Sequence, residues 1–242
     1  MKIVAISDVH GRNFAELIPN CDTLIIAGDI LRNFGYRGIN LQEQWFLGNF
    51  LSELERVNAK YKIFIAGNHD FYFENLFKND MEDKMRSLLP KNVYYLRDNS
   101  IVLDGIKFHG TPWVTHLRNW AFNIPNGSEQ KYFDTYYSKI DNDVDLLISH
   151  CPPYGYGDSI LEFNETENLG NKMLMKAINQ KKVKRVVFGH IHSGNHNKMI
   201  HSYVGYGGDD AFISEMYNVS LLNESYNIHY NPLILNIEKH KE

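Results

Sequence analysis

The chain has 242 residues, of which 43% are hydrophobic and 22% charged, with a formal net charge of −4. These are ordinary values for a globular protein, and the charge offers no basic face for a long nucleic acid. No run of about 18 apolar residues and no leader-like segment precede or interrupt the predicted elements, so we expect no membrane span, no secretion and a cytoplasmic location.

Strands and helices alternate in the first half of the sequence. Apolar runs predict strands at 2–7, 22–28 and 61–67, and helices are predicted at 13–18, 41–60 and 74–89. In segment 41–60 the apolar side chains recur at helical spacing, which indicates a long amphipathic helix. This rhythm predicts parallel strands joined by right-handed crossovers.

The second half is richer in short β segments. Strands are predicted at 93–96, 100–103, 106–109, 145–149, 183–189, 200–207, 215–221 and 233–239, with one helix at 170–180. Asp104-Gly105 is a hairpin signal between two of these strands. Two sheets packed face to face, with helices outside each, account for this order. No linker or repeat interrupts the chain, so we expect a single domain over residues 1–242.

Five of the apolar runs end in residue types that bind metals. These residues are Asp8 and His10, Asp29, Asn68, His150, and His190 and His192. The carboxyl ends of strands in an α/β sheet converge, so we expect one shared polar site. Residues i and i+2 of a strand share a face, which would pair the first two residues and the last two. Any one of the carboxylates alone would rather be interpreted as a helix N-cap or a turn residue.

The composition of this set indicates a metal centre. Carboxylate, amide and imidazole ligands without cysteine suit manganese, iron, zinc or a similar divalent ion. Seven candidate ligands exceed one tetrahedral site and suit two ions about 3.5–4 Å apart that share a bridging carboxylate. Glycine precedes three of the strand-end residues, at Gly28, Gly67 and Gly189, and allows the close backbone approach such a site needs.

The motifs Asp8-x-His10, Gly28-Asp29, Gly67-Asn68-His69-Asp70, His150 and Gly189-His190-x-His192 resemble, in order, those of the calcineurin-like metallophosphoesterases. The resemblance covers residues 1–192. It implies an α/β fold, a four-layer α/β/β/α sandwich of two mixed β-sheets flanked by helices. It also implies a first ion on Asp8, His10, Asp29 and His192, and a second on Asn68, His150, His190 and the bridging Asp29. His69 would lie beside the ions as the catalytic general acid.

Segments 110–123, 145–158 and 217–238 add a narrower resemblance, to the small metallophosphoesterase-domain proteins related to class III cyclic-nucleotide phosphodiesterases. The superfamily's protein phosphatases carry a second aspartate and an Arg-Gly pair after the bridging aspartate. Here GDILRNFG has only Arg32, which argues against a phosphoprotein substrate. The chain keeps both histidines of the GHxH motif, so full occupancy by two metals is expected.

These features predict a metal-dependent phosphoesterase that hydrolyses small phosphodiesters, nucleotide-like or aryl, by attack of a metal-bound hydroxide at a dinuclear centre. Manganese is favoured, with iron, zinc, nickel and cobalt as alternatives. A phosphomonoesterase, or a slow metal-filled scaffold that binds nucleotides or a protein partner, stays open, as does the oligomeric state. The acidic net charge disfavours a DNA nuclease.

Two further assignments stay open in the sequence. Asp70 is a candidate partner for orienting His69, although adjacency in sequence does not establish contact. Trp113, His116, Trp120 and Phe122 follow the strand at 106–109. They could form a substrate-side wall or close the core beneath the site.

Overall fold

The computed structural model describes residues 1–32, 37–162, 165–204 and 211–238. Parts of the segments predicted at 200–207 and 233–239, and part of GDILRNFG, lie outside these residues. The first sheet has the strand order β13-β1-β2-β3-β4. Its strands are β13 (Leu233–Asn236), β1 (Lys2–Ile6), β2 (Cys21–Ala27), β3 (Ala59–Ile65) and β4 (Val93–Tyr95). Only β13 runs antiparallel to its neighbour.

The second sheet has the order β11-β12-β10-β7-β6-β5. Its strands are β11 (Met199–Tyr203), β12 (Phe212–Asn218), β10 (Arg185–Phe188), β7 (Leu146–Ser149), β6 (Ile106–Thr111) and β5 (Asn99–Leu103). The four inner strands are parallel, and the edge strands β11 and β5 are antiparallel to them. A separate hairpin, β8 (Ser159–Glu162) with β9 (Glu165–Asn168), was not predicted.

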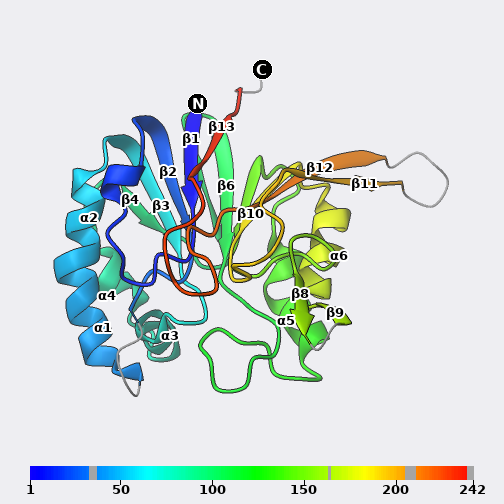
Figure 1. Ribbon diagram of the computed structural model, residues 1–242, viewed down its shortest axis with the longest axis horizontal. Helices are drawn as coiled ribbons and strands as arrows, with labels where there is room; N and C mark the ends of the chain where they lie inside the picture. Colours follow the sequence, from blue (N-terminus) through cyan, green and yellow to red (C-terminus); the bar gives the residue numbers. More distant parts are fainter. Residues whose placement is uncertain (33–36, 163–164, 205–210, 239–242) are drawn as a thin grey trace.

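Helices cover the outer faces of both sheets (Figure 1). On one side lie α1 (Ile39–Trp45), α2 (Leu51–Arg56), α3 (Phe71–Lys78) and α4 (Glu82–Arg86); on the other lie α5 (Glu129–Thr135) and α6 (Lys172–Lys181). The short turns η1 (Ala15–Leu17) and η4 (Tyr137–Lys139) are 3-10 helical. Among the described residues, no helix combines the length and the apolar character needed to cross a membrane.

Three helix predictions need correction, and one helix was not predicted. The segment predicted as a helix at 13–18 is a single 3-10 turn, η1 (Ala15–Leu17). The segment predicted as one helix at 41–60 contains a π-helical turn, η3 (Phe46–Phe50), between α1 and α2, and β3 already begins at Ala59. The segment predicted at 74–89 is two helices, α3 and α4, because Asp80 adopts a left-handed conformation with φ 54°. Helix α5 was missed.

Strand alternation divides the core into layers. In β1, Ile3 and Ala5 pack between the two sheets with Phe108 and Ile148. The intervening residues of β1 belong to the core beneath the helices, for example Val4. Because residues i and i+1 of a strand face opposite sides, each inner strand buries both faces. The four-layer α/β/β/α sandwich of two mixed sheets is therefore confirmed.

Candidate metal centre

The candidate ligands come from loops at the carboxyl ends of strands in both sheets. β1, β2 and β3 of the first sheet lead to Asp8, Asp29 and Asn68, while β7 and β10 of the second lead to His150 and His190. Asp8 and His150 are fully buried, and Asp29 and Asn68 are 2% exposed. The predicted convergence of distant sequence segments at one edge is present in the structure.

The side chains predicted to share a strand face do lie close together, but the explanation by strand geometry is wrong. β1 ends at Ile6 and β10 at Phe188, so Asp8, His10 and His190 lie beyond the strands. Asp8, His10, Asp29 and His190 all have left-handed backbones, with φ of 55°, 42°, 50° and 73°. Such conformations are unusual for residues other than glycine and cost about 1–3 kcal/mol each. Tight loops, rather than strand pleating, bring these side chains together.

The glycines before the ligands provide the close approach that the sequence suggested. A Cβ on Gly189 would overlap the Asp8 carboxylate, and one on Gly67 would overlap the Asp29 carboxylate. A Cβ on Gly28, whose φ is 95°, would overlap the imidazole of His150. At these positions a side chain would occupy the space of a candidate ligand.

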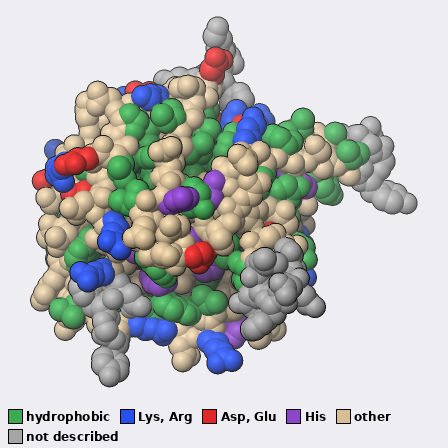
Figure 2. Space-filling model, viewed as in Figure 1, with side chains coloured by type: hydrophobic (Ala, Val, Ile, Leu, Met, Phe, Trp, Pro, Cys, Tyr) green, Lys and Arg blue, Asp and Glu red, His purple; other side chains and the backbone are tan. Residues whose placement is uncertain are grey.

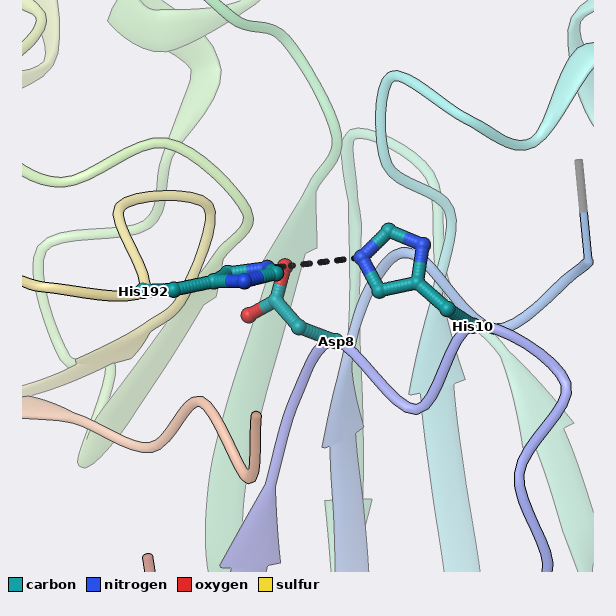
Figure 3. A group of neighbouring side chains, drawn as sticks. All are labelled: Asp8, His10 and His192. Carbon is teal, nitrogen blue, oxygen red and sulfur yellow. Dashed lines mark ion pairs between the residues drawn. The ribbon is translucent and has the colours of Figure 1, made fainter. Parts of the chain in front are cut away.

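Asp8, His10 and His192 form one cluster, in which both imidazoles lie beside the carboxylate (Figure 3). The Nε2 atoms of His10 and His192 lie 3.9 and 3.5 Å from Asp8 Oδ1. His192 Nδ1 lies 3.1 Å from the carbonyl oxygen of Asn223, which accepts its proton and leaves Nε2 directed toward Asp8. Burial opposes charge on His192, but Asp8 outweighs it and raises the pKa of His192 to about 9.

Asp29 lies between this cluster and a second one. Its Oδ2 is 3.7 Å from His10 Nε2 and 3.3 Å from His150 Nε2. His150 Nε2 is also 2.9 Å from Asn68 Oδ1, and its Nδ1 is 2.9 Å from the Ala27 carbonyl oxygen. Burial disfavours charge on both partners, yet Asp29 raises the pKa of His150 to about 9, and the histidines hold the pKa of Asp29 well below its ordinary value. This central position is the one a bridging ligand requires.

His190 and His69 have less direct positions. The backbone N–H of His190 donates to Asp8 Oδ2 at 3.0 Å, and its ring centroid lies 5.1 Å from that of His150. Burial and the nearby histidine lower the pKa of His190 to about 3. His69 Nε2 lies 3.9 Å from Asp29 Oδ2, close enough to join His10 and Asp29 as a third possible ligand group. The roles of His69 as non-ligand and His190 as ligand stay predictions.

Asp70 does not orient His69. Its carboxylate accepts hydrogen bonds from the backbone N–H groups of Gly67 and Leu31, both at 2.8 Å. The buried Gln42 instead donates to the carbonyl oxygen of His69 at 2.8 Å. The Asp70 carboxylate therefore ties the loop after β2 to the loop after β3, and Gln42 positions the backbone of His69.

The residues present fit divalent metal ions. His10 Nε2 is buried without a hydrogen-bond partner between the carboxylates of Asp8 and Asp29. A buried polar atom left this way is costly unless something binds it. Ligand atoms 3–4 Å apart can share an ion that lies about 2.1 Å from each.

A cavity of about 170 Å³ opens onto this centre. Its lining residues are Asp29, Asn68, His69, Leu117, Trp120, His190, His192, Glu224 and Tyr226. Trp120 packs against His69, with ring centroids 4.2 Å apart, as expected of a wall residue. Leu117, Glu224 and Tyr226 were not singled out from the sequence, because none belongs to a spaced motif.

The other aromatic residues after β6 have different positions. Trp113 and Phe122 are buried in the core, and the Trp113 indole N–H donates to Asp98. His116 is exposed and lines another cavity of about 570 Å³. Of this group only Trp120 lines the cavity at the candidate metal centre. Trp113 and Phe122 close the core, as the second alternative expected, and a substrate-side role for Trp120 stays a prediction.

The comparisons with known proteins agree with this geometry. Residues 1–194 match the family described as Calcineurin-like phosphoesterase. The match covers most of the chain, which therefore belongs to the calcineurin-like phosphoesterase family.

Similar proteins extend over more of the chain. It is 30% identical to the UPF0046 protein T07D4.2 of Caenorhabditis elegans across 99% of its length, and 30% identical to human metallophosphoesterase domain-containing protein 1 across 80%. The chain spans 61% of the length of each of these relatives. The solved structure of TT1561 from Thermus thermophilus superimposes with a TM-score of 0.57 at 12% identity, covering 90% of this chain and 88% of that one. This likeness concerns the fold alone.

Proposed function

We propose that this protein is a metal-dependent phosphodiesterase that acts on small nucleotide-like or aryl substrates. The observation that carries the proposal is the cluster of Asp8, His10, Asp29, His150 and His192 beneath a small open cavity. Such a set would hold two divalent ions, with manganese favoured and Asp29 between them. Family membership supports the reaction class.

Different residues of the chain would have different roles in the proposed hydrolysis. Two bound divalent ions would supply positive charge to phosphoryl oxygens and acidify a water molecule. Asn68 and His150 would complete the ligand set beside Asp29, and the left-handed loops hold the carboxylates before substrate arrives. His69 lines the cavity and would give a proton to the leaving alkoxide. Trp120, whose ring packs against that of His69 at an interplanar angle of 35°, would limit the rotation of that imidazole.

The charge of the cavity supports a diester substrate. No lysine or arginine occurs among the described residues that line it. Phosphate monoesters carry close to two negative charges at neutral pH and are commonly bound by arginine. A diester carries one negative charge and needs less compensation, so the lining favours it. The volume of the cavity, about 170 Å³, also suits one phosphoryl group with a small substituent rather than a polymer.

A turnover screen tests this function. The protein is stripped with EDTA, reloaded with manganese, and assayed on aryl monoesters, aryl diesters and 2′,3′- and 3′,5′-cyclic nucleotides. We expect chelation to abolish hydrolysis, manganese to restore it, and diesters to have the higher kcat/KM. Hydrolysis that survives with no metal detected by elemental analysis would refute the metal mechanism. Higher kcat/KM on monoesters would assign a phosphomonoesterase, and no turnover with two ions bound would indicate a scaffold.

A further inference from the structure

A turn near the carboxyl end of the chain borders the candidate metal centre. It comprises residues 223–226, between β12 and β13, and lies outside the part of the chain that matches the family model, residues 1–194. In Figure 1 the segment that joins these two strands crosses in front of the sheets. Three of its residues contact the ligand loops, so it is part of the site.

Hydrogen bonds fix this turn to the loop after β10. The carbonyl oxygen of Asn223 accepts from His192 Nδ1 at 3.1 Å. The next side chain, Glu224, accepts from the backbone N–H of Ser193 at 2.8 Å through Oε1. The Glu224 carboxylate is therefore held one residue away from a candidate ligand while it lines the cavity.

Aromatic contacts and a cation fix the other end of the turn. The Tyr226 ring lies edge-on to the imidazoles of His10 and His192, with centroids 4.9 and 5.3 Å away. Arg12 Nη2 donates to the Tyr226 carbonyl oxygen at 2.9 Å and does not line the cavity. The turn is thus held on both sides of Glu224, which limits how far the carboxylate can move.

The charge of Glu224 is the distinctive feature of the cavity wall. The other carboxylate in the lining is Asp29, whose charge a bound ion would offset. On the face shown in Figure 2, acidic side chain atoms border the histidines near the centre. A carboxylate at this position repels an approaching anion, and the repulsion doubles when the anion carries two charges instead of one.

We propose that Glu224 is a specificity-determining residue that selects monoanionic phosphate esters over dianionic ones. The inference rests on the proposed function, since it concerns the substrate of that same site. Glu224 belongs to none of the candidate ligand groups that the described residues form. It acts through its charge beside the path of the phosphoryl group.

The experiment compares two substrates that differ by one methyl group and one charge. p-Nitrophenyl phosphate is a dianion at pH 8, and methyl p-nitrophenyl phosphate is a monoanion with the same leaving group. For Glu224→Gln we expect kcat/KM on the monoester to rise roughly 3- to 10-fold, and on the diester by the square root of that factor, about 1.7- to 3-fold, because the repulsion energy is half as large. The gain should shrink at high salt, because exposed charges are screened.

A matched variant controls for the loss of a charge elsewhere. Glu55 is exposed on α2, in the helical layer outside the first sheet, and does not line the cavity. Glu55→Gln removes the same charge and should leave both rates and their ratio unchanged. Metal content is matched by elemental analysis, since Glu224 lies close to His192. An unchanged substrate ratio in Glu224→Gln would overturn the proposal.

Binding provides a readout that does not need turnover. Calorimetry on the manganese-loaded protein at pH 8 measures the dissociation constants of inorganic phosphate and of dimethyl phosphate. Glu224→Gln should tighten phosphate binding roughly 3- to 10-fold and dimethyl phosphate binding only by about 1.7- to 3-fold. If wild type hydrolyses neither ester, the proposed function fails, whereas these binding constants still decide the role of Glu224. Equal changes for both anions would contradict charge selection.

Discussion

The substitution Gly189→Ala tests how strongly a single added methyl group in the loop after β10 lowers stability and metal affinity. The new Cβ would overlap Oδ2 of Asp8 and Oγ of Ser7. Both neighbours are fully buried and hydrogen-bonded: Asp8 accepts from the His190 N–H, and Ser7 donates to the Ala27 carbonyl oxygen at 2.8 Å. Neither can move without breaking a buried hydrogen bond, so the overlap must be relieved by displacing the loop or the carboxylate.

The size of the effect follows from overpacking. Extra atoms in a well-packed interior cost about 1–3 kcal/mol. For a chain of this length, 1 kcal/mol corresponds to roughly 2–4 °C in Tm, so the metal-free variant should melt about 2–12 °C lower. Displacement of Asp8 should also weaken metal binding. If the whole cost falls on the bound state, the Kd for manganese rises by about 5- to 150-fold.

Gly48→Ala is the matched control. A Cβ there would have no neighbour within 4 Å, and the position lies in a helical segment on an exposed face. We expect it to leave manganese affinity unchanged and to raise stability by up to about 1 kcal/mol, because alanine favours helix more than glycine. Calorimetric Tm with and without EDTA, and manganese titration, measure both variants. Wild-type affinity and Tm in Gly189→Ala would refute the close approach.

Two further substitutions separate roles within the centre. Asp29→Ala should lose more metal than Asp8→Ala or Asn68→Ala, because the bridging position contacts both ions; about two ions per chain in Asp29→Ala, by elemental analysis, would exclude that role. His69→Asn should keep its metals but lose roughly 10²- to 10⁴-fold in kcat on alkoxide leaving groups, and less on p-nitrophenyl esters. A loss independent of leaving-group pKa would mean that His69 is not the acid.

The sequence predicts the sandwich well because its signals are local. The buried strands are continuous apolar runs, and the residues that follow them, such as Asp8, Asp29 and His150, are marked by a change in polarity. All three lie together in the structure. The apolar runs locate these positions without any knowledge of long-range contacts. Their closeness in space follows because the carboxyl ends of parallel strands converge.

The features that the sequence did not predict depend either on nonlocal contacts or on small local changes of the backbone. Glu224 and Tyr226 border the cavity only because the turn binds His192 and Ser193 from another element. The π-helical turn at Phe46–Phe50 and the break at Asp80 are local changes, and they leave the apolar pattern of their segments unchanged. The spacing of apolar residues indicates which face of a segment is buried, but it does not indicate small changes in the backbone dihedral angles.

The two-sheet origin of the ligands has a consequence for stability. Asp8 and Asp29 follow strands of the first sheet, and His150 and His192 follow strands of the second. The left-handed backbones of Asp8, Asp29 and His190 store strain, and buried apolar neighbours such as Val9 and Ile30 pack within the same loops. Apolar burial stabilises both the sandwich and these loops, while hydrogen bonds and His–Asp pairs hold the charged side chains together. Metal binding would add to the polar contacts and link the two sheets at the edge where the candidate ligand loops meet.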